Sequence, residues 1–237
     1  MREGVVHVVG AGLAGLAAAV RLARSGVKCM VHEAAAHAGG RCRSYFDAAL
    51  GMRIDNGNHI VLSGNHATLA YLGCIGAGEA LQGPDHAVFD FIDLAAKERW
   101  RLEPSHGPIP WWIFDPQRRI PATKPRDFLA AVRLLWAGGE ERVRDRMACE
   151  GSLYERLWRP LLLAALNTEP SEAAAALAGA VLRESLVKGG RACRPLIAWQ
   201  GLSEAFVDPA VRFLTKKGSS IHYGERLRSM RFEKHMV

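Results

Sequence analysis

Residues 5–44 read VVHVVGAGLAGLAAAVRLARSGVKCMVHEAAAHAGGRCRS. The opening valines predict a short buried parallel strand that ends at Gly10, because β-branched runs favour such strands. Apolar residues then recur at helical spacing from Leu13, and Gly26 ends the predicted helix. A second strand is predicted over roughly residues 27–32, running into Glu33. The stretch therefore predicts a parallel βαβ unit.

The turn between the first strand and the helix carries glycines at positions 10, 12 and 15. In a nucleotide-binding unit, Gly10 would permit the tight turn and Gly12 would let backbone amides approach a diphosphate. Gly15 would let the helix pack closely on the strand. We expect the diphosphate at the amino end of the helix, beside Leu13 and Ala14, where free N–H groups and the helix dipole favour negative charge.

An acidic residue ends the second predicted strand. Glu33 follows Gly10 by 23 residues and is followed by Ala34. At this spacing a carboxylate accepts hydrogen bonds from the hydroxyls of an adenosine ribose. The βαβ unit is thus predicted to bind a dinucleotide, and to this point either a nicotinamide or a flavin nucleotide would fit.

The next loop discriminates between these two cofactors. Gly39, Gly40 and Arg41 follow the acid after only five residues, where a nicotinamide dehydrogenase normally continues into another helix. A Gly-Gly-Arg sequence instead places flexible backbone and a cation beside a diphosphate, and the planar fork of donors on Arg suits that position. The loop favours FAD over a nicotinamide cofactor.

Residues 8–44 resemble the FAD-binding signature of the flavin amine oxidase and carotenoid desaturase superfamily. The stretch IDNGNHIVLSGNH, residues 54–66, is similar to the D-x-G-x-H segment of that group. The resemblance implies that FAD is the cofactor and that Asp55 orders the loop. It also implies that Gly57, Asn58 and His59 lie near the flavin. Leu227, at a position where Val is more usual, would contribute backbone contacts near the adenine.

The positions of glycine and proline residues divide the chain into regions of different predicted structure. Residues 67–83 predict a helix and a Gly-rich turn, and residues 87–104 predict antiparallel strands. Prolines predict loops up to residue 125, and helices follow to about residue 186, with breaks at Gly138–Gly139, Pro160 and Pro170. Residues 201–233 predict a helix that ends at Gly218, then a strand, a turn and a strand.

These regions, with the resemblance, predict an α/β fold of two domains. An FAD/NAD(P)-binding Rossmann-like domain would comprise residues 1–83 and 196–237, and an inserted, mainly helical substrate domain would comprise residues 84–195. Members of the superfamily continue well beyond the point that corresponds to Val237. The resemblance therefore implies an amino-terminal fragment that lacks the carboxy-terminal, flavin-closing segment, is inactive alone, and has unpaired strand edges prone to association.

Composition excludes several other kinds of function. The five cysteines are widely spaced without a C-x-x-C pair, and the nine histidines show no metal-binding spacing. This pattern predicts reduced thiols in a cytosolic setting and no metal site. The net charge is +7, but the basic residues are scattered and no nucleic-acid-binding motif accompanies them, so no nucleic-acid partner is expected. No stretch predicts a bilayer-spanning helix.

Three further stretches are more specific than the superfamily signature. Residues 107–114, 157–186 and 194–230 resemble the squalene-associated branch, which acts in bacterial hopanoid synthesis; residues 187–195 depart from it by being more basic and Gly-rich. The resemblance implies that reduced flavin replaces the hydroxyl of a C30 isoprenoid alcohol by hydrogen, giving squalene. His59 is the candidate acid that protonates the departing hydroxyl.

Three alternatives remain open on the sequence. The chain could belong to a carotenoid-type desaturase, which removes hydride from its substrate, or to an amine oxidase. It could also be a non-catalytic flavin-fold protein that binds nucleotide or partner enzymes.

An apolar substrate requires an apolar tunnel. The candidate lining residues are large and apolar, although core packing is their more common role: Trp111, Trp112, Phe114, Trp136, Leu161, Leu162, Leu163 and Leu166. In residues 126–139, α-helical spacing would place Phe128, Leu129, Val132, Leu135 and Trp136 largely on one face beside arginines. Packing inside the protein is the favoured interpretation, and shallow insertion into a membrane face is the alternative.

Overall fold

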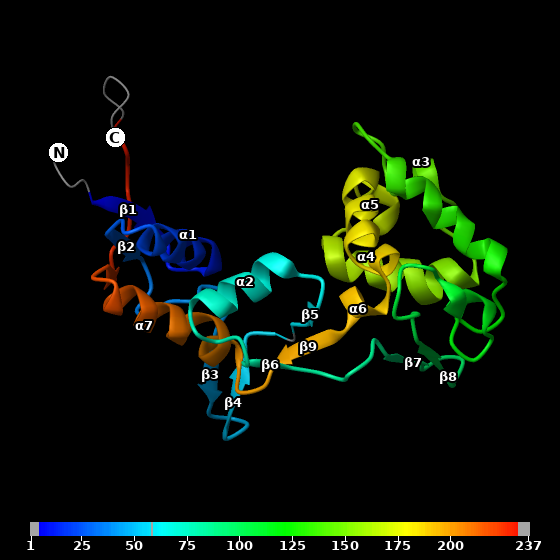
Figure 1. The fold of residues 1–237 in the computed structure, drawn as a ribbon, viewed down its shortest axis with the longest axis horizontal. Helices are drawn as coiled ribbons and strands as arrows, with labels where there is room; N and C mark the ends of the chain where they lie inside the picture. The colour runs from blue at the N-terminus through cyan, green and yellow to red at the C-terminus, as the bar shows by residue number, and fades with distance from the viewer. Residues whose placement is uncertain (1–4, 58, 232–237) are drawn as a thin grey trace. The chain divides into compact units, whose positions relative to one another are not determined.

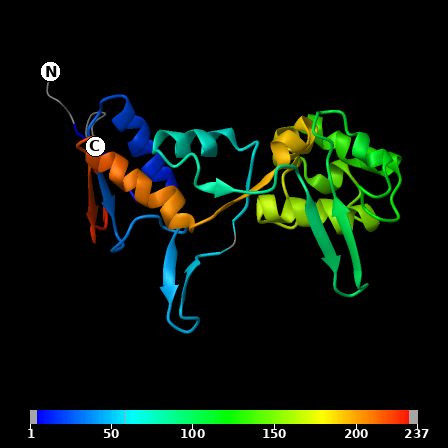
Figure 2. The ribbon, with the colours of Figure 1, turned by 60° about the horizontal axis from the view of Figure 1, so that its bottom comes forward.

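The computed structural model describes residues 5–57 and 59–231 (Figures 1 and 2). Two compact units are formed, each from separate stretches of the chain. The described parts of residues 1–60, 66–82 and 197–237 make up the first, called the sheet unit below. Residues 61–65 and 83–196 make up the second, called the helical unit.

A three-stranded parallel sheet is the centre of the sheet unit. Its strands are β1 (Val6–Val9), β2 (Cys29–Glu33) and β10 (Ser220–Tyr223), in the order β1-β2-β10. Helix α1 (Leu13–Arg24) joins β1 to β2 and buries Leu16 and Val20. The predicted βαβ unit is therefore confirmed.

Strand β1 is not buried as its valine run predicts. Val5, Val6 and Val9 are 48%, 38% and 56% exposed. The reason is that β1 pairs only with β2 and so forms an edge of the described sheet. Sequence alone does not say which strand of a parallel sheet lies at its edge.

The remaining elements of the sheet unit surround this sheet. Helix α7 (Asp208–Lys216) follows a π-helical turn, η6 (Ser203–Val207), and packs against α1 with Leu214 fully buried. Strand β10 then forms as expected, but residues 225–231 are irregular, so the second strand expected after Gly224 is absent from the described chain. The others are an antiparallel hairpin, one helix and a short strand: β3 (Ser44–Asp47), β4 (Met52–Asp55), α2 (His66–Cys74) and β6 (Leu81–Gln82).

Strand β9 (Pro195–Ala198) carries the chain from the helical unit into the sheet unit. Its first half pairs antiparallel with β5 (Val61–Leu62) in the helical unit. Its second half pairs antiparallel with β6 in the sheet unit, with Gln82 opposite Ile197.

The helical unit contains one antiparallel hairpin and a set of mostly short helices. Its elements, in chain order, are β7 (Phe89–Asp93), β8 (Glu98–Leu102), η1 (Trp111–Phe114), η2 (Pro125–Trp136), α3 (Val143–Arg146), η3 (Tyr154–Trp158), α4 (Arg159–Leu166), η4 (Pro170–Glu172), α5 (Ala175–Glu184), η5 (Leu186–Lys188) and α6 (Gly190–Cys193). Its core includes the fully buried Leu134, Val143 and Leu162. Gly179 on α5 lies so close to η2 that a Cβ would be 2.1 Å from the carbonyl oxygen of Leu134.

Segment η2 is a 3₁₀ helix and not the α-helix that its apolar spacing predicts. Phe128, Ala131 and Leu134 are its buried residues, which is the period of three expected for three residues per turn. Trp136 therefore leaves the row that contains Leu129 and Val132, and it is 73% exposed. Over twelve residues, periods of 3.0 and 3.6 differ too little for the sequence to separate them.

Pro160 does not break the helix in which it lies, contrary to expectation. The π-helical turn η3 runs directly into α4, and Pro160 is within the first two positions of α4. Proline lacks an N–H group, so the change from π to α hydrogen bonding at this point loses no backbone donor. Pro209 occupies the same place after η6.

Candidate functional site

The glycine turn between β1 and α1 is as tight as its spacing predicts. Gly10 has a φ of +91°, which favours glycine. A Cβ on Gly15 would lie 1.8 Å from the carbonyl oxygen of Gly10. The helix can approach the strand this closely only because position 15 has no side chain.

The amino end of α1 is open and uncapped. Gly12 begins the helix with extended backbone, no side chain caps this end, and the first turn contains no acidic residue. A Cβ on Gly12 would meet nothing within 4 Å. Leu13 and Ala14 are exposed. Free amides, open space and an unopposed helix dipole suit a diphosphate, so the residues present fit the predicted ligand.

Glu33 anchors the loops around this helix start. Its Oε2 accepts the N–H of Ala11 at 2.7 Å, and its Oε1 accepts the N–H of Ala35 at 2.8 Å. The hydrogen bond from the Ala35 N–H has the largest effect and lowers the pKa of Glu33 below its ordinary value. Partial burial acts in the opposite direction but is the smaller effect. The carboxylate is therefore ionised at neutral pH, and each oxygen retains a lone pair for a further donor.

The structure brings the Gly-Gly-Arg loop against the start of α1. Gly39 donates its N–H to the carbonyl of Ala11 at 2.8 Å and forms a parallel bridge with Gly12. A Cβ on Gly39 would lie 2.5 Å from the carbonyl oxygen of Cys42. Arg41 is exposed, and its guanidinium makes no hydrogen bond or ion pair within residues 5–57 and 59–231.

Asp55 lies in a polar network that joins three distant parts of the sheet unit. Its Oδ1 accepts the hydroxyl of Ser44 at 2.6 Å and the N–H of Leu202 at 2.9 Å. Ser44 and Ser203 exchange two hydrogen bonds, N–H to hydroxyl in each direction, at 2.7 and 3.0 Å. Through these hydrogen bonds Asp55 connects the hairpin β3–β4 to the segment that enters α7, which is how it would order the loop.

Two further members of this network, Glu204 and Gly201, lie outside any motif of the sequence. Glu204 accepts a second, longer hydrogen bond from the Ser44 hydroxyl at 3.2 Å and pairs with Arg53 at 2.8 Å. Gly201 has a φ of +130°, and a Cβ there would lie 2.7 Å from the Ser44 Oγ. The one sign of this close contact in the sequence is the glycine at position 201, and no recognisable motif surrounds it.

Replacing Asp55 by alanine should lower the free energy of unfolding by about 2–3 kcal/mol, because it leaves the Leu202 N–H and the Ser44 hydroxyl without their acceptor. Urea denaturation followed by circular dichroism measures the change. Asp90→Ala is the matched control; Asp90 pairs with Arg101 in an exposed hairpin, and its loss should cost less than about 1 kcal/mol. Equal effects of the two substitutions would contradict a structural role for the network.

The other predicted site residues are less well defined by the structure. Gly57 has a φ of +112°, and Asn58 lies outside the described residues. His59 is exposed and makes no hydrogen bond or ion pair within the described chain, so its role as an acid stays a prediction. Leu227 is 46% exposed and follows β10, whose end lies beside Glu33 through the bond from the Glu225 N–H to the Glu33 carbonyl.

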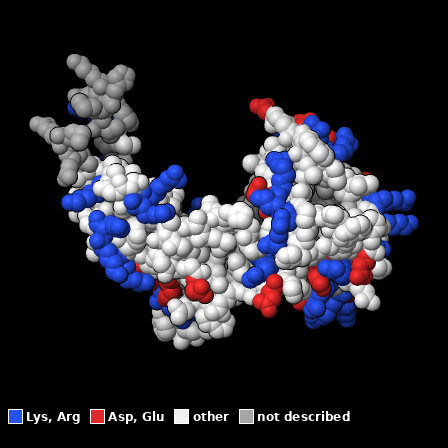
Figure 3. Space-filling view, in the orientation of Figure 1, with Lys and Arg blue, Asp and Glu red and all other residues white. Residues whose placement is uncertain are grey.

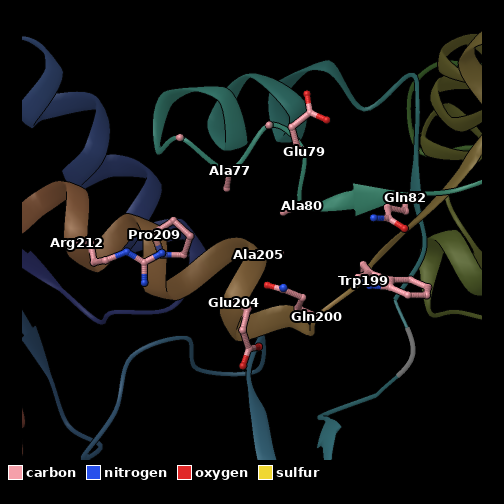
Figure 4. Close-up of a pocket in the computed structure, with 12 residues that line it drawn as sticks. Ala77, Glu79, Ala80, Gln82, Trp199, Gln200, Glu204, Ala205, Pro209 and Arg212 are labelled. Atoms are coloured by element: carbon pink, nitrogen blue, oxygen red, sulfur yellow. The ribbon is translucent and has the colours of Figure 1, made fainter.

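Two cavities lie within the sheet unit. One, of about 520 Å³, is lined by Ala38 and Ser44, which flank the Gly-Gly-Arg loop, and by Arg43, Arg53 and Arg212. The other, of about 350 Å³, is shown in Figure 4 and lies between the turn after α2 and the segment that leads into α7. Its wall carries acidic, amide and basic side chains but none of the predicted cofactor residues.

An apolar cavity of about 300 Å³ lies in the helical unit. Its lining contains no charged side chain and comes from the segments around η1, η2, Trp158 and η5. Of the predicted tunnel residues, Trp112 alone lines it. Leu162 is fully buried in the core, and Trp111, Phe114 and Trp136 are exposed. Phe128, Leu129 and Val132 line the cavity and were not among those candidates.

Burial raises the pKa of Cys42 to about 11 and of Cys193 to about 12, so both thiols are neutral at physiological pH. Among residues 5–57 and 59–231, no group of three side chains of ligand type is arranged to hold a metal ion. No helix in the same residues is long and apolar enough to cross a membrane.

The sequence model of the flavin-containing amine oxidoreductases matches residues 13–237. With the glycine turn, Glu33 and the Gly-Gly-Arg loop in place, the chain belongs to this flavin-containing family. The predicted FAD cofactor and α/β fold are confirmed at this level.

Within the family, the chain is similar to enzymes named hydroxysqualene dehydroxylase. It is 55% identical over 225 residues to that of Rhodopseudomonas palustris and 48% identical over 225 residues to that of Sinorhizobium fredii. Each match covers 95% of this chain and 54% of the relative. The chain therefore spans about half the length of the curated relatives it matches.

Solved structures support the fold alone, because their sequence identities are low. An oxidoreductase from Methanosarcina mazei matches with a TM-score of 0.65 at 16% identity, covering 98% of this chain and 54% of that one. Cyclohexylamine oxidase from Brevibacterium oxydans matches with a TM-score of 0.59 at 19% identity, covering 92% and 50%.

Proposed function

We propose that the protein acts as an FAD-dependent oxidoreductase that converts hydroxysqualene to squalene, as a step of hopanoid synthesis. The observation that carries the proposal is the identity of 45–55% to three hydroxysqualene dehydroxylases over at least 95% of this chain. Identity of this size extends through both units, so it includes the inserted helical segment as well as the common cofactor fold. The sheet unit would bind FAD and the helical unit would bind substrate.

The cofactor roles follow from the contacts around α1. The amides of Gly12, Leu13 and Ala14 would hold the diphosphate, and the free guanidinium of Arg41 would add a positive charge beside it. Glu33 would accept the ribose hydroxyls with the lone pairs that Ala11 and Ala35 leave free. Gly10, Gly15, Gly39 and Gly40 would let these backbone segments approach one another and the ligand.

The reaction replaces a carbon–oxygen bond by a carbon–hydrogen bond. When bound, reduced FAD would supply two electrons as hydride, and a proton would convert the departing hydroxyl to water, so that hydroxysqualene and reduced FAD would give squalene, water and oxidised FAD. His59 is proposed to deliver that proton, because its side chain is exposed and an imidazole group can transfer a proton. The protein would also exclude competing water from the reacting carbon.

The substrate is a long hydrocarbon with a single hydroxyl, which requires an apolar site. The 300 Å³ cavity of the helical unit, free of charged lining residues, has the size and chemistry to hold part of such a chain. A substrate of this kind resides in membranes, so we expect the protein to work from the cytoplasm at a membrane face.

Squalene formation tests the activity. Protein produced from the complete coding sequence, loaded with FAD and reduced anaerobically, should convert hydroxysqualene in detergent micelles to squalene, as detected by gas chromatography. The same protein with oxidised FAD is the control and should give none, because the reaction consumes two electrons. Conversion of phytoene by the oxidised protein, without squalene formation by the reduced one, would instead identify a desaturase.

A further inference from the structure

The helical unit exposes an unusual set of large apolar side chains around η1 and η2. Five of them are more than half exposed, and we call this set the η1–η2 patch: Ile109 (55%), Trp111 (64%), Phe114 (59%), Leu129 (64%) and Trp136 (73%). Single exposed apolar residues are common, but five of them, three aromatic, on or beside two neighbouring elements are typical of a binding surface.

The 3₁₀ geometry of η2 explains how these side chains are held outward. One row of the helix, Phe128, Ala131 and Leu134, is fixed in the core. With three residues per turn, Leu129 and Trp136 belong to the other two rows of the helix, away from this buried row. Both side chains are more than half exposed, although Leu135, at the end of the row of Leu129, packs against the core.

The apolar cavity of the helical unit borders this patch at Leu129, the one patch residue that lines it. Leu129 and Val132 line the cavity and are also 64% and 37% exposed, so they mark its mouth. Pro108 and Pro110, which bracket the exposed Ile109, line the same cavity from the segment that leads into η1. Leu129 of the patch and the two prolines beside Ile109 therefore border the same apolar cavity.

Basic side chains accompany the patch on η2. Arg126 is 77% exposed and approaches an acid, Asp127, only at 3.8 Å. The Asp127 carboxylate also accepts a hydrogen bond from the Lys124 N–H at 2.8 Å. Arg133 is exposed and makes no ion pair or hydrogen bond within the part of the chain that the structure describes. Figure 3 shows other basic side chains in separate groups on the drawn face, so charge alone does not select one surface.

We propose that the η1–η2 patch is the surface by which the protein docks on an anionic phospholipid membrane, and that the cavity beside Leu129 admits the apolar substrate directly from the bilayer. Exposed tryptophans suit the interfacial layer, and Arg126 and Arg133 suit the phosphate charges beside it. Contact of this kind is peripheral. The entry of substrate rests on the proposed function, whereas the docking surface does not.

Vesicle flotation tests the docking surface. The full chain should float with vesicles of phosphatidylcholine mixed with phosphatidylglycerol, and less with phosphatidylcholine alone. Trp111→Gln/Trp136→Gln should lower the bound fraction at limiting lipid about tenfold or more, because both aromatic anchors are lost. Arg126→Gln/Arg133→Gln should lower binding to the anionic vesicles about tenfold and leave binding to the neutral ones unchanged.

Matched controls exclude general effects of removing apolar area or charge. Leu50→Gln/Leu94→Gln replaces two leucines in hairpin turns, which are 63% and 79% exposed. Arg99→Gln/Arg101→Gln removes two positive charges from β8. Both controls should float like the unmodified chain. The proposal is overturned if no variant differs from the unmodified chain, if controls and patch variants lose binding equally, or if the unmodified chain does not float.

Two further measurements separate the alternatives. If sedimentation shows a dimer without lipid that the tryptophan variant abolishes, the patch is an interface between copies and the membrane proposal fails. In detergent micelles, where no bilayer is needed, squalene formation by the unmodified protein tests the proposed function without the docking step. If the unmodified protein forms no squalene there, the proposed function fails while the flotation result stands by itself.

Discussion

Replacing Gly15 by alanine is expected to unfold the sheet unit. A Cβ at this position would lie 1.8 Å from the Gly10 carbonyl oxygen and 3.0 Å from its carbon, and both are backbone atoms that no rotamer change can move. Helix α1 would have to shift off β1 by more than 1 Å, which disrupts the packing of Leu16 and Val20 against the sheet. We expect a loss of about 3 kcal/mol or more in the free energy of unfolding, measured by urea denaturation.

The control for this substitution is a helical glycine with open space around it. Gly73 lies within α2, and a Cβ there would meet nothing within 4 Å. Gly73→Ala should stabilise the protein by about 0.5–1 kcal/mol, because alanine is the better helix former. A Gly15→Ala variant that unfolds at the same urea concentration as the unmodified chain would show that the close approach of helix and strand is not required.

Gly12→Val should abolish FAD binding while leaving the fold intact. The backbone of Gly12 is extended, with a φ of −70°, and its Cβ position is open, so the folded chain accommodates a side chain there. The branched side chain would instead occupy the space at the helix start that the diphosphate needs. Loss of two charge-assisted hydrogen bonds weakens the affinity for FAD about 100-fold or more.

Two measurements on the same protein check this separation of stability from binding. Quenching of flavin fluorescence gives the affinity, and circular dichroism gives the melting temperature without cofactor, which should stay within about 3 °C of the unmodified value. Gly12→Ala, with a smaller side chain, should give an intermediate affinity. Unchanged FAD binding in the valine variant would refute the assignment of the diphosphate to this helix.

Local spacing explains which parts of the site were predictable from sequence. The glycine turn, Glu33 and the Gly-Gly-Arg loop lie within 32 residues of one another and are constrained by the geometry of one βαβ unit. The structure brings the glycine turn, Glu33 and Gly39 together through bonds to Ala11. Which of these residues contact FAD stays a prediction.

The remaining features depend on interactions that sequence spacing does not encode. Ser44 and Ser203 are joined although they are 159 residues apart, and no motif marks Ser203. The exposure of β1 depends on its place in the sheet, and the close approach of Gly179 to the Leu134 carbonyl joins two segments 45 residues apart. An α-helical period groups Trp136 with Leu129, whereas the 3₁₀ period of η2 places them on different rows.

The pairing of β6 with β9 has a consequence for protein engineering. Gln82 and Ile197 are antiparallel partners, so the chain leaves the sheet unit and returns to it at neighbouring points, with residues 83–196 inserted between them. Partners in such a pair have Cα atoms roughly 5 Å apart, a gap that a two-residue turn bridges. A miniature scaffold could therefore keep the dinucleotide fold and carry a different insert at this position. The same arrangement lets the length and shape of the inserted segment diverge between related proteins without disturbing the cofactor fold.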